Sequence, residues 1–395
     1  MNGDKMVEQG GKQDFARIPK AKPYVGLEEV EQLVQVLRSG WLSNGPKTRE
    51  FESKIADYLG VEKEKVIVVT NCTSAIHASL LALGVGKGDE VLVADFTFPA
   101  TAHAVMYIGA KPRFIDIDRS TYNIDPSKVE EMINERTKAI IPVHTFGQPA
   151  EMDELIGIAE RNGIRLIEDA ACAFGAMYKD KPAGTMGDTG CYSFHAIKGI
   201  TCGEGGAIVA KEREMADRAR RLCNYGIESA WDRQSNVSIP SFTSLGYNYK
   251  ISDLQSAVAL AQLNKIDRIL ERREKLARAW SHELSSLVAK GLLVEQSSPQ
   301  HITPCHQSRV IILSQSIDRN RVIMTMRERF NIETTIGTYA CHEQPVYRSK
   351  DSCPISKSVA DQSLSLPFYY ELTMEAIQYC AKSLTESIEL SRRSD

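Results

Sequence analysis

The sequence contains no apolar run long enough to cross a bilayer, which takes about 20 residues. It has no excess of one charge: 48 basic and 51 acidic residues leave a net charge of −3, so neither nucleic acid nor an anionic membrane is expected as a main partner. Its nine cysteines include no CxxC pair, and its opening residues lack the apolar core of a signal peptide. We therefore expect a reduced, cytoplasmic protein with free thiols.

The composition of the chain is that of an ordinary globular protein, with 43% hydrophobic and 25% charged residues among 395. This length predicts two or three domains and a core large enough to shield a site from water. We expect a flexible N-terminal arm over residues 1–22, a large α/β domain over residues 23–255, and a connecting helix with a smaller C-terminal domain over residues 256–395.

Short apolar runs alternate with helical stretches between residues 66 and 170. The strand-like runs are apolar on both faces, as in a parallel sheet that helices cover on both sides. This alternation predicts a wound α/β sheet, in which ligands bind at the carboxyl ends of the strands. After about residue 210 the alternation fades, and the stretch ISDLQSAVALAQLNKIDRILERREKLARAWSHEL predicts a long connecting helix.

The first feature at a strand end is VVTNCTSAIHASL, where a strand gives way to small polar residues and then a helix. The backbone N–H groups of a helix start, together with the hydroxyls of Thr73 and Ser74, would form a phosphate cradle. Taken alone, the same pattern is more often an ordinary helix cap. The chain has no GxxxxGK[ST] motif, so a nucleotide P-loop is not indicated.

Two more strand ends carry residues of interest. Phe98, in ADFTFPATAHA, lies in a strand-to-helix turn and could stack on a flat ring, although core packing is the commoner role of such a residue. Asp169, in IRLIEDAACAFGA, ends an apolar strand, where a carboxylate is costly unless a cation such as a protonated ring nitrogen pairs with it. A helix cap or a surface salt bridge is the alternative for Asp169.

The fourth feature is CYSFHAIKGITCGEGG, in which Ser193 follows an apolar strand and Lys198 precedes a glycine-rich turn. Glycines at 203, 205 and 206 would let the backbone approach a ligand closely. A lysine that is desolvated beside another cation has a lowered pKa and becomes an amine nucleophile. A solvated loop lysine is the plain alternative.

These four features together indicate pyridoxal phosphate. A phosphate cradle, a stacking aromatic ring, a carboxylate for a ring nitrogen and a nucleophilic lysine are the groups that hold this cofactor. Lys198 would then bind the aldehyde carbon of the cofactor covalently.

The chain resembles the DegT/DnrJ/EryC1/StrS family of sugar aminotransferases from about residue 23 onward. The resemblance rests on the following stretches: SGWLSNGP, TFPAT, VHTFGQPAEMD, EDAACAFGA, YSFHAIKGITCGEGGAIV, LGYNYKISDLQSAVALAQL and LPFYYELT. It implies a fold type I transferase, with a mostly parallel seven-stranded sheet flanked by helices and a smaller C-terminal α+β domain. It also implies a homodimer with shared active sites, which moves an amine from glutamate to a nucleotide-linked keto-sugar for amino-sugar or polysaccharide biosynthesis.

The resemblance also assigns roles to residues. Lys198 would be the catalytic amine, Asp169 would hold the ring nitrogen, and Phe98 would cover one face of the ring. Asn248, in GYNY, would reach the phosphate bound by the neighbouring subunit. The phosphate itself would be held by the following residues: Cys72, Thr73, Ser74 and Ser193.

Three positions depart from the common pattern of the family. Cys172 stands where glutamine, histidine or glutamate is usual near the cofactor ring, and a thiol is a weak hydrogen-bond donor. Cys72 stands where glycine is usual, and NYGIE at residues 224–228 replaces the more usual NHG. A dehydratase branch of the family has histidine in place of the lysine, and the presence of Lys198 sets that branch aside.

Three other functions compete with this interpretation. The chain could be an aminotransferase acting on a cyclitol keto substrate, or a regulatory member of the fold without turnover. The stretch HITPCH at residues 301–306 could bind a metal, but its spacing fits no familiar helix pair and no carboxylate lies close in sequence, so we expect no metal site.

Overall fold

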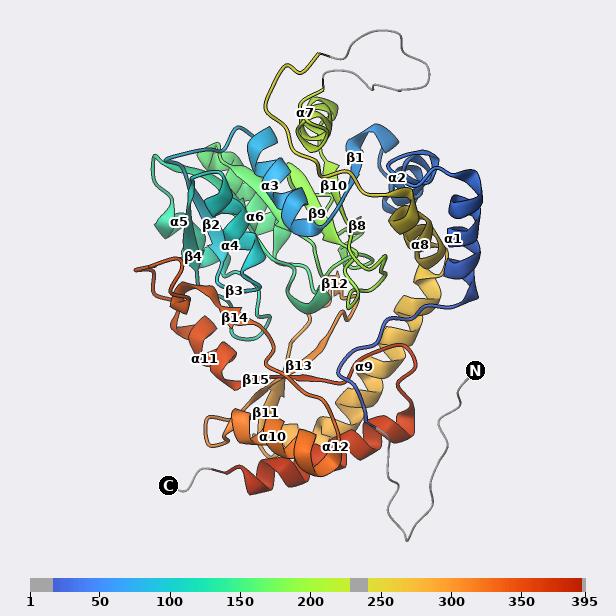
Figure 1. Cartoon of the computed structure of the whole chain (residues 1–395). Coiled ribbons are helices and arrows are strands. Elements are labelled where there is room, and N and C mark those ends of the chain that lie inside the picture. The colour runs from blue at the N-terminus through green and yellow to red at the C-terminus, as the bar shows by residue number, and fades with distance from the viewer. Residues whose placement is uncertain (1–16, 228–240, 393–395) are drawn as a thin grey trace.

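The computed structural model describes residues 17–227 and 241–392, and its central element is a seven-stranded sheet with the strand order β1-β10-β9-β6-β5-β2-β4 (Figure 1). Its strands are β1 (Val66–Val69), β2 (Glu90–Ala94), β4 (Lys111–Ile115), β5 (Thr137–Ile141), β6 (Arg165–Asp169), β9 (Thr189–Ser193) and β10 (Gly206–Ala210). Within this sheet β10 runs antiparallel to both of its neighbours, and the other strands share one direction. The predicted mostly parallel sheet is confirmed.

Helices cover both faces of this sheet because successive strand side chains point to opposite sides. Ile67 and Val69 of β1 belong to the core under one layer of helices, whereas Val66 and Val68 belong to the core under the other. The first layer consists of α3 (Cys72–Ala82), α4 (Ala100–Tyr107) and α7 (Arg213–Cys223). The second layer includes α2 (Pro46–Leu59), α5 (Pro126–Met132), α6 (Met152–Asn162) and α8 (Asp253–Leu263).

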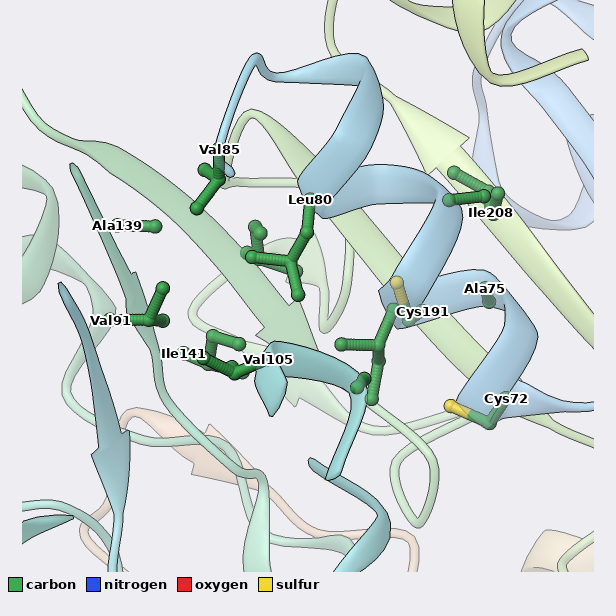
Figure 2. Packing of buried hydrophobic residues seen from close by; sticks show 14 of the residues in the cluster. Cys72, Ala75, Leu80, Val85, Val91, Val105, Ala139, Ile141, Cys191 and Ile208 are labelled. Carbon is green, nitrogen blue, oxygen red and sulfur yellow. The ribbon is translucent and has the colours of Figure 1, made fainter. Parts of the chain in front are cut away.

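Figure 2 shows the core of the first layer, where Leu80 of α3 lies among sheet residues such as Val91 and Ile141. Leu80, Val91 and Ile141 are fully buried. A helix packed this closely holds its N-terminus in a defined place at the carboxyl end of β1, which matters for the site described below.

The C-terminal part of the chain forms a second packing unit. The helix α9 (Ile266–Ala289) leads to it from the region of the large sheet (Figure 1). A three-stranded antiparallel sheet packs there around the buried Trp280. The strands of this sheet are β11 (Leu293–Glu295), β13 (Arg309–Leu313) and β15 (Ser363–Leu366). The helices of the C-terminal part are α10 (Arg319–Phe330), α11 (Pro354–Gln362) and α12 (Met374–Leu390). This α+β character agrees with the prediction, while the domain boundary near residue 255 stays a prediction.

Short elements join the C-terminal part to loops beside the large sheet. β14 (Tyr339–Ala340) pairs with β3 (Phe96–Thr97), and β12 (Ile302–Thr303) pairs with β7 (Met177–Tyr178). The remaining elements are α1 (Leu27–Ser39), β8 (Lys181–Pro182) and the 3₁₀ turns η1 (Lys63–Lys65), η2 (Thr145–Gly147) and η3 (Cys341–Glu343). Segments far apart in the sequence therefore meet beside the strand ends.

The connecting helix predicted as one stretch is in fact two helices, α8 and α9. Lys265 separates them with a non-helical backbone, at φ −115° and ψ 14°. Its ammonium is buried and lies 2.6 Å from the carboxylate of Glu29 in α1. The break lets α8 pack on α1 and α2 while α9 runs to the C-terminal part, a tertiary demand that helical periodicity does not reveal.

Residues 17–22, placed by the sequence in an N-terminal arm, lie against the C-terminal part. Ile18 is 4% exposed and forms a parallel bridge with Ile332. Residues 1–16 of that arm lie outside the described residues. Within the described ranges no helix combines the length and the apolar character needed to span a membrane.

Candidate active site

The register of the large sheet brings three strand ends to one edge. Gly206, at the start of β10, pairs with Val69 at the end of β1 and with Ser193 at the end of β9. Asp169, at the end of β6, pairs with Cys191 of β9. The loops after β1, β6 and β9 carry most of the predicted site residues, so the sheet places these residues along the edge where open α/β sheets bind ligands.

The turn between β1 and α3 leaves backbone donors for an anion. Asn71 caps α3, since its Oδ1 accepts a hydrogen bond from the Ser74 amide at 2.8 Å. The amides of Cys72 and Thr73 have no acceptor within the described part of the chain. The ordinary helix cap is therefore present, but it occupies only the Ser74 amide. The amides of Cys72 and Thr73 suit a phosphate bound at the helix N-terminus. A Cβ on Gly206 would lie 2.5 Å from the carbonyl carbon of Asn71, so only glycine allows this close approach.

Asp169 is a buried carboxylate that forms no ion pair within residues 17–227 and 241–392. It is 4% exposed, and its Oδ2 accepts from the Thr101 hydroxyl at 2.6 Å while its Oδ1 accepts from the Ala171 amide at 3.1 Å. Turns rather than a helix follow it, and no ion pair involving it occurs among the described residues, so neither alternative role applies. A buried carboxylate without a cation is costly, and a protonated ring nitrogen would remove that cost.

Lys198 is half-buried, and its Nζ donates a hydrogen bond to the Sγ of Cys172 at 3.0 Å. Burial lowers the pKa of the Lys198 ammonium, but the neighbouring Cys172 and the charge of Asp169 raise it, and the net direction is upward. The lowered pKa expected for Lys198 is therefore wrong. Among the neighbours of Lys198, the Cys172 thiol and the Asp169 carboxylate raise its pKa by more than burial lowers it.

Ser193 and Phe98 occupy different environments. Ser193 is buried, and its Oγ accepts a hydrogen bond from the His195 amide at 3.3 Å, which leaves the hydroxyl proton for a ligand. Phe98 is 64% exposed, so the core-packing alternative for it is wrong. Its ring meets that of Tyr339 edge to face at 6.1 Å, and its carbonyl accepts from the amide of Thr101, the residue that binds Asp169. An exposed ring on the turn that also carries Thr101, the residue that binds the Asp169 carboxylate, suits stacking on a planar ligand.

Asn248 stands apart from this cluster within one chain. It is exposed, and its Oδ1 accepts from the ammonium of Lys250 at 2.7 Å. Its segment runs beside β1 through a bridge between Lys250 and Val69. Among the described residues no hydrogen bond joins Asn248 to the Lys198 cluster, so its predicted role needs a second subunit.

The side chains of His301, Cys305 and His306 in HITPCH each contact a different residue. His301 meets Glu151 at 3.0 Å and His306 meets Glu274 at 2.8 Å, through Nε2 in both cases. Cys305 donates its thiol to the Cys172 carbonyl at 3.1 Å and so supports the turn after Asp169. The two histidines do not share a ligand site.

Among the described residues, the side chains of Asp95, His342 and Cys353 lie close enough together to hold a metal ion. Asp95 Oδ2 and His342 Nδ1 lie 2.7 Å apart, however, which is the distance of a hydrogen bond between them. We interpret the pair as a buried ionic contact.

Sequence reasoning missed two residues of the site. Thr101 binds the Asp169 carboxylate, and a hydroxyl in the TFPAT stretch was the only signal for it. Arg273 of α9 is 8% exposed and donates to the carbonyls of His306 at 2.7 Å, Gln307 at 2.9 Å and Lys198 at 3.5 Å. Nothing in the helical pattern around Arg273 distinguishes it from a surface arginine.

Comparison with known proteins agrees with this geometry. The profile of the DegT/DnrJ/EryC1/StrS aminotransferase family matches residues 23–385. An uncharacterised protein of Methanocaldococcus jannaschii is 36% identical over 90% of this chain and 94% of its own. The spore coat polysaccharide biosynthesis protein SpsC of Bacillus subtilis is 32% identical over 94% of this chain and 97% of its own. The aminotransferase TlmJ of Streptoalloteichus hindustanus superposes with a TM-score of 0.88 at 28% identity, over 94% and 99% of the two chains.

The observed groups fit the cofactor of this family. Free amides at the start of α3 suit the phosphate, the unpaired carboxylate of Asp169 suits the ring nitrogen, and the Lys198 amine suits the aldehyde. The predicted family, fold type and enzyme class are thus confirmed together. The chain belongs to the DegT/DnrJ/EryC1/StrS aminotransferase family and is an aminotransferase that depends on pyridoxal phosphate.

Proposed function

We propose that the protein transfers the amino group of glutamate to a nucleotide-linked keto-sugar, and so serves amino-sugar or polysaccharide biosynthesis. The observation that carries the proposal is the amine of Lys198 beside Cys172 and Asp169, at the strand edge that also has open phosphate donors. The name of SpsC, a spore coat polysaccharide biosynthesis protein, supports a product used in a polysaccharide.

Each site residue has a role in this proposal. Pyridoxal phosphate supplies an electron sink for the substrate carbon when it is bound. Asp169 keeps the ring nitrogen protonated, because an ion pair in a shielded site favours both charged forms. Lys198 holds the cofactor and then moves a proton to and from the substrate carbon through its Nζ. Phe98 covers one face of the ring, and the phosphate contacts come from the following residues: Cys72, Thr73, Ser74 and Ser193.

The proposed active unit is a homodimer with shared sites. Asn248 is exposed and lies outside the Lys198 cluster of its own chain. Across a two-fold axis the same patch serves both subunits, so Asn248 of one chain would complete the phosphate site of the other. The free state of all nine cysteines supports a reducing compartment such as the cytoplasm.

A direct test uses purified protein with added cofactor. We expect a yellow protein that makes an amino-sugar from glutamate and one of a panel of nucleotide-linked keto-sugars, with the product identified by mass. Borohydride should fix the cofactor to the peptide that contains Lys198, and Lys198→Ala should bind cofactor weakly without turnover.

The outcomes separate the alternatives. Turnover with keto-cyclitols alone would favour a cyclitol aminotransferase, and cofactor binding without any turnover would favour a regulatory protein. A fixed cofactor on a peptide that lacks Lys198 would refute the site.

A further inference from the structure

Backbone hydrogen bonds hold the segment of residues 17–20, with which the described part of the chain begins. The Ile18 amide donates to the Asn331 carbonyl at 3.0 Å, and the Glu333 amide donates to the Ile18 carbonyl at 2.9 Å. Lys20 is fixed on both sides: its amide donates to Glu333 Oε2 at 3.2 Å and its carbonyl accepts from the Phe368 amide at 2.9 Å. The backbone of Lys20 therefore has little freedom.

The ammonium of Lys20, by contrast, has no hydrogen bond and no ion pair within residues 17–227 and 241–392, although the residue is half-buried. Burial and the nearby charge of Lys198 lower the pKa of Lys20. Lys22, two positions later, is mostly exposed and lies 3.7 Å from the carboxylate of Glu371. Of these two lysines, only Lys20 has an ammonium without a partner among the residues that the structure describes.

A chain of contacts leads from Lys20 to the catalytic lysine. Phe368, which binds the Lys20 carbonyl, places its ring 5.7 Å from the guanidinium of Arg273. Arg273 in turn donates to the Lys198 carbonyl at 3.5 Å. Lys20 also interacts electrostatically with Lys198 and with Cys172, so its half-buried charge lies within range of the reactive amine.

We propose that Lys20 binds the α-carboxylate of the amino-acid donor. This inference rests on the proposed function. An unpaired, partly buried ammonium is a strong partner for a carboxylate, because a charge-assisted hydrogen bond there removes the cost of an isolated charge.

The position of Lys20 favours the donor over the sugar substrate. In an amino acid, the carboxylate carbon is bonded directly to the carbon that carries the amine, so a cation near the Lys198 amine is in reach of it. In a nucleotide-linked sugar, the phosphates lie on the anomeric carbon, several bonds away from a ring ketone. Lys20 would also orient the α-carbon for proton transfer to Lys198 Nζ, an effect of positioning rather than of chemistry.

The test compares Lys20→Met with Lys22→Met as the matched control. We expect Lys20→Met to raise the KM for glutamate by at least about tenfold, which is about 1.4 kcal/mol of binding. The KM for the keto-sugar should stay within about twofold of wild type, and Lys20→Arg should recover part of the donor affinity. Lys22→Met should behave as wild type because its charge is already paired at the surface.

A binding measurement makes the test independent of turnover. Maleate, an unreactive dicarboxylate, should bind the cofactor-loaded wild type and Lys22→Met in calorimetry and should bind Lys20→Met at least about tenfold more weakly. Equal maleate affinity in all three proteins would overturn the role of Lys20 while leaving the proposed function intact. A raised KM for the keto-sugar alone would assign Lys20 to the phosphates instead. A wild type that binds maleate through Lys20 but turns over no keto-sugar would instead point to an error in the proposed function.

Discussion

At the scale of single residues, neighbouring positions in the strand ending at Asp169 have opposite roles. Glu168 is fully buried, and its carboxylate accepts from the amides of Gly184, Met186 and Gly187 at 2.6 to 2.7 Å. It also meets His144 Nε2 at 3.0 Å. Since adjacent strand residues point to opposite faces, Glu168 holds the fold together while Asp169 faces the site. Of these two adjacent carboxylates, Glu168 therefore has a structural role, and Asp169 is the one proposed to act in the chemistry.

Cys172 allows a prediction about the charge of Lys198. Burial alone lowers the pKa of Lys198, and Cys172 is the first of the neighbours that raise it. In cofactor-free Cys172→Ala, the Lys198 pKa should therefore fall, and its labelling by an amine-reactive ester should begin at a lower pH than in wild type. The measurement is the pH dependence of Lys198 labelling, followed by peptide mass spectrometry.

Cys305→Ala is the control for this experiment, because its thiol contacts the Cys172 carbonyl and not the Lys198 amine. We expect turnover of Cys172→Ala to fall by less than about tenfold, or about 1.4 kcal/mol of barrier. An unchanged labelling profile would show that the thiol does not set the charge of Lys198.

At the scale of elements, a buried ionic contact joins the end of β2 to the segment after β14. Asp95 is fully buried and accepts from His342 Nδ1 at 2.7 Å, from the His342 amide at 2.6 Å and from the Ser356 hydroxyl. His342 comes from η3, so this contact joins the C-terminal part to the large sheet. The hydrogen bond to Asp95 raises the pKa of His342 above its ordinary 6.5, with smaller contributions from Glu343 and Asp116.

The sign of the resulting pH dependence follows from the raised pKa. The stabilisation by His342 is fully present below pH 6.5 and is lost as the pH rises through the higher pKa of the folded state. We expect His342→Gln to lower the melting temperature more at pH 6 than at pH 9. Calorimetry at pH 6 and pH 9 measures the melting temperatures of wild type and His342→Gln. His282→Gln is the control, because the His282 side chain is exposed. An equal loss at the two pH values would mean that the charge of His342 does not stabilise the fold.

At the scale of the whole molecule, the proposed shared site can be tested with mixed dimers. Lys198→Ala and Asn248→Ala should each be nearly inactive, because each removes a group that every site needs. After dissociation and reassociation, half of the dimers should be mixed and each of these should contain one native site. Activity should then return to about a quarter of wild type, as the symmetry of a two-fold dimer requires.

A second pair of variants controls for this effect. Lys198→Ala mixed with Asp169→Asn should recover no activity, because both residues lie in the cluster of one chain. Verified mixed dimers of the first pair that stay inactive would place Asn248 in its own subunit's site or outside both.

The sequence by itself determined the sheet and the cofactor class, and it predicted Asp169 and Lys198 as the catalytic pair. Strand-helix alternation follows from local periodicity, and Asp169 and Lys198 stand at strand ends that any wound sheet brings to one edge. Only the tertiary structure decided that Lys20 lies within electrostatic range of Lys198, that Thr101 binds Asp169, and that α8 and α9 are separate helices. These features depend on contacts between residues far apart in the chain, and local patterns carry no record of such contacts.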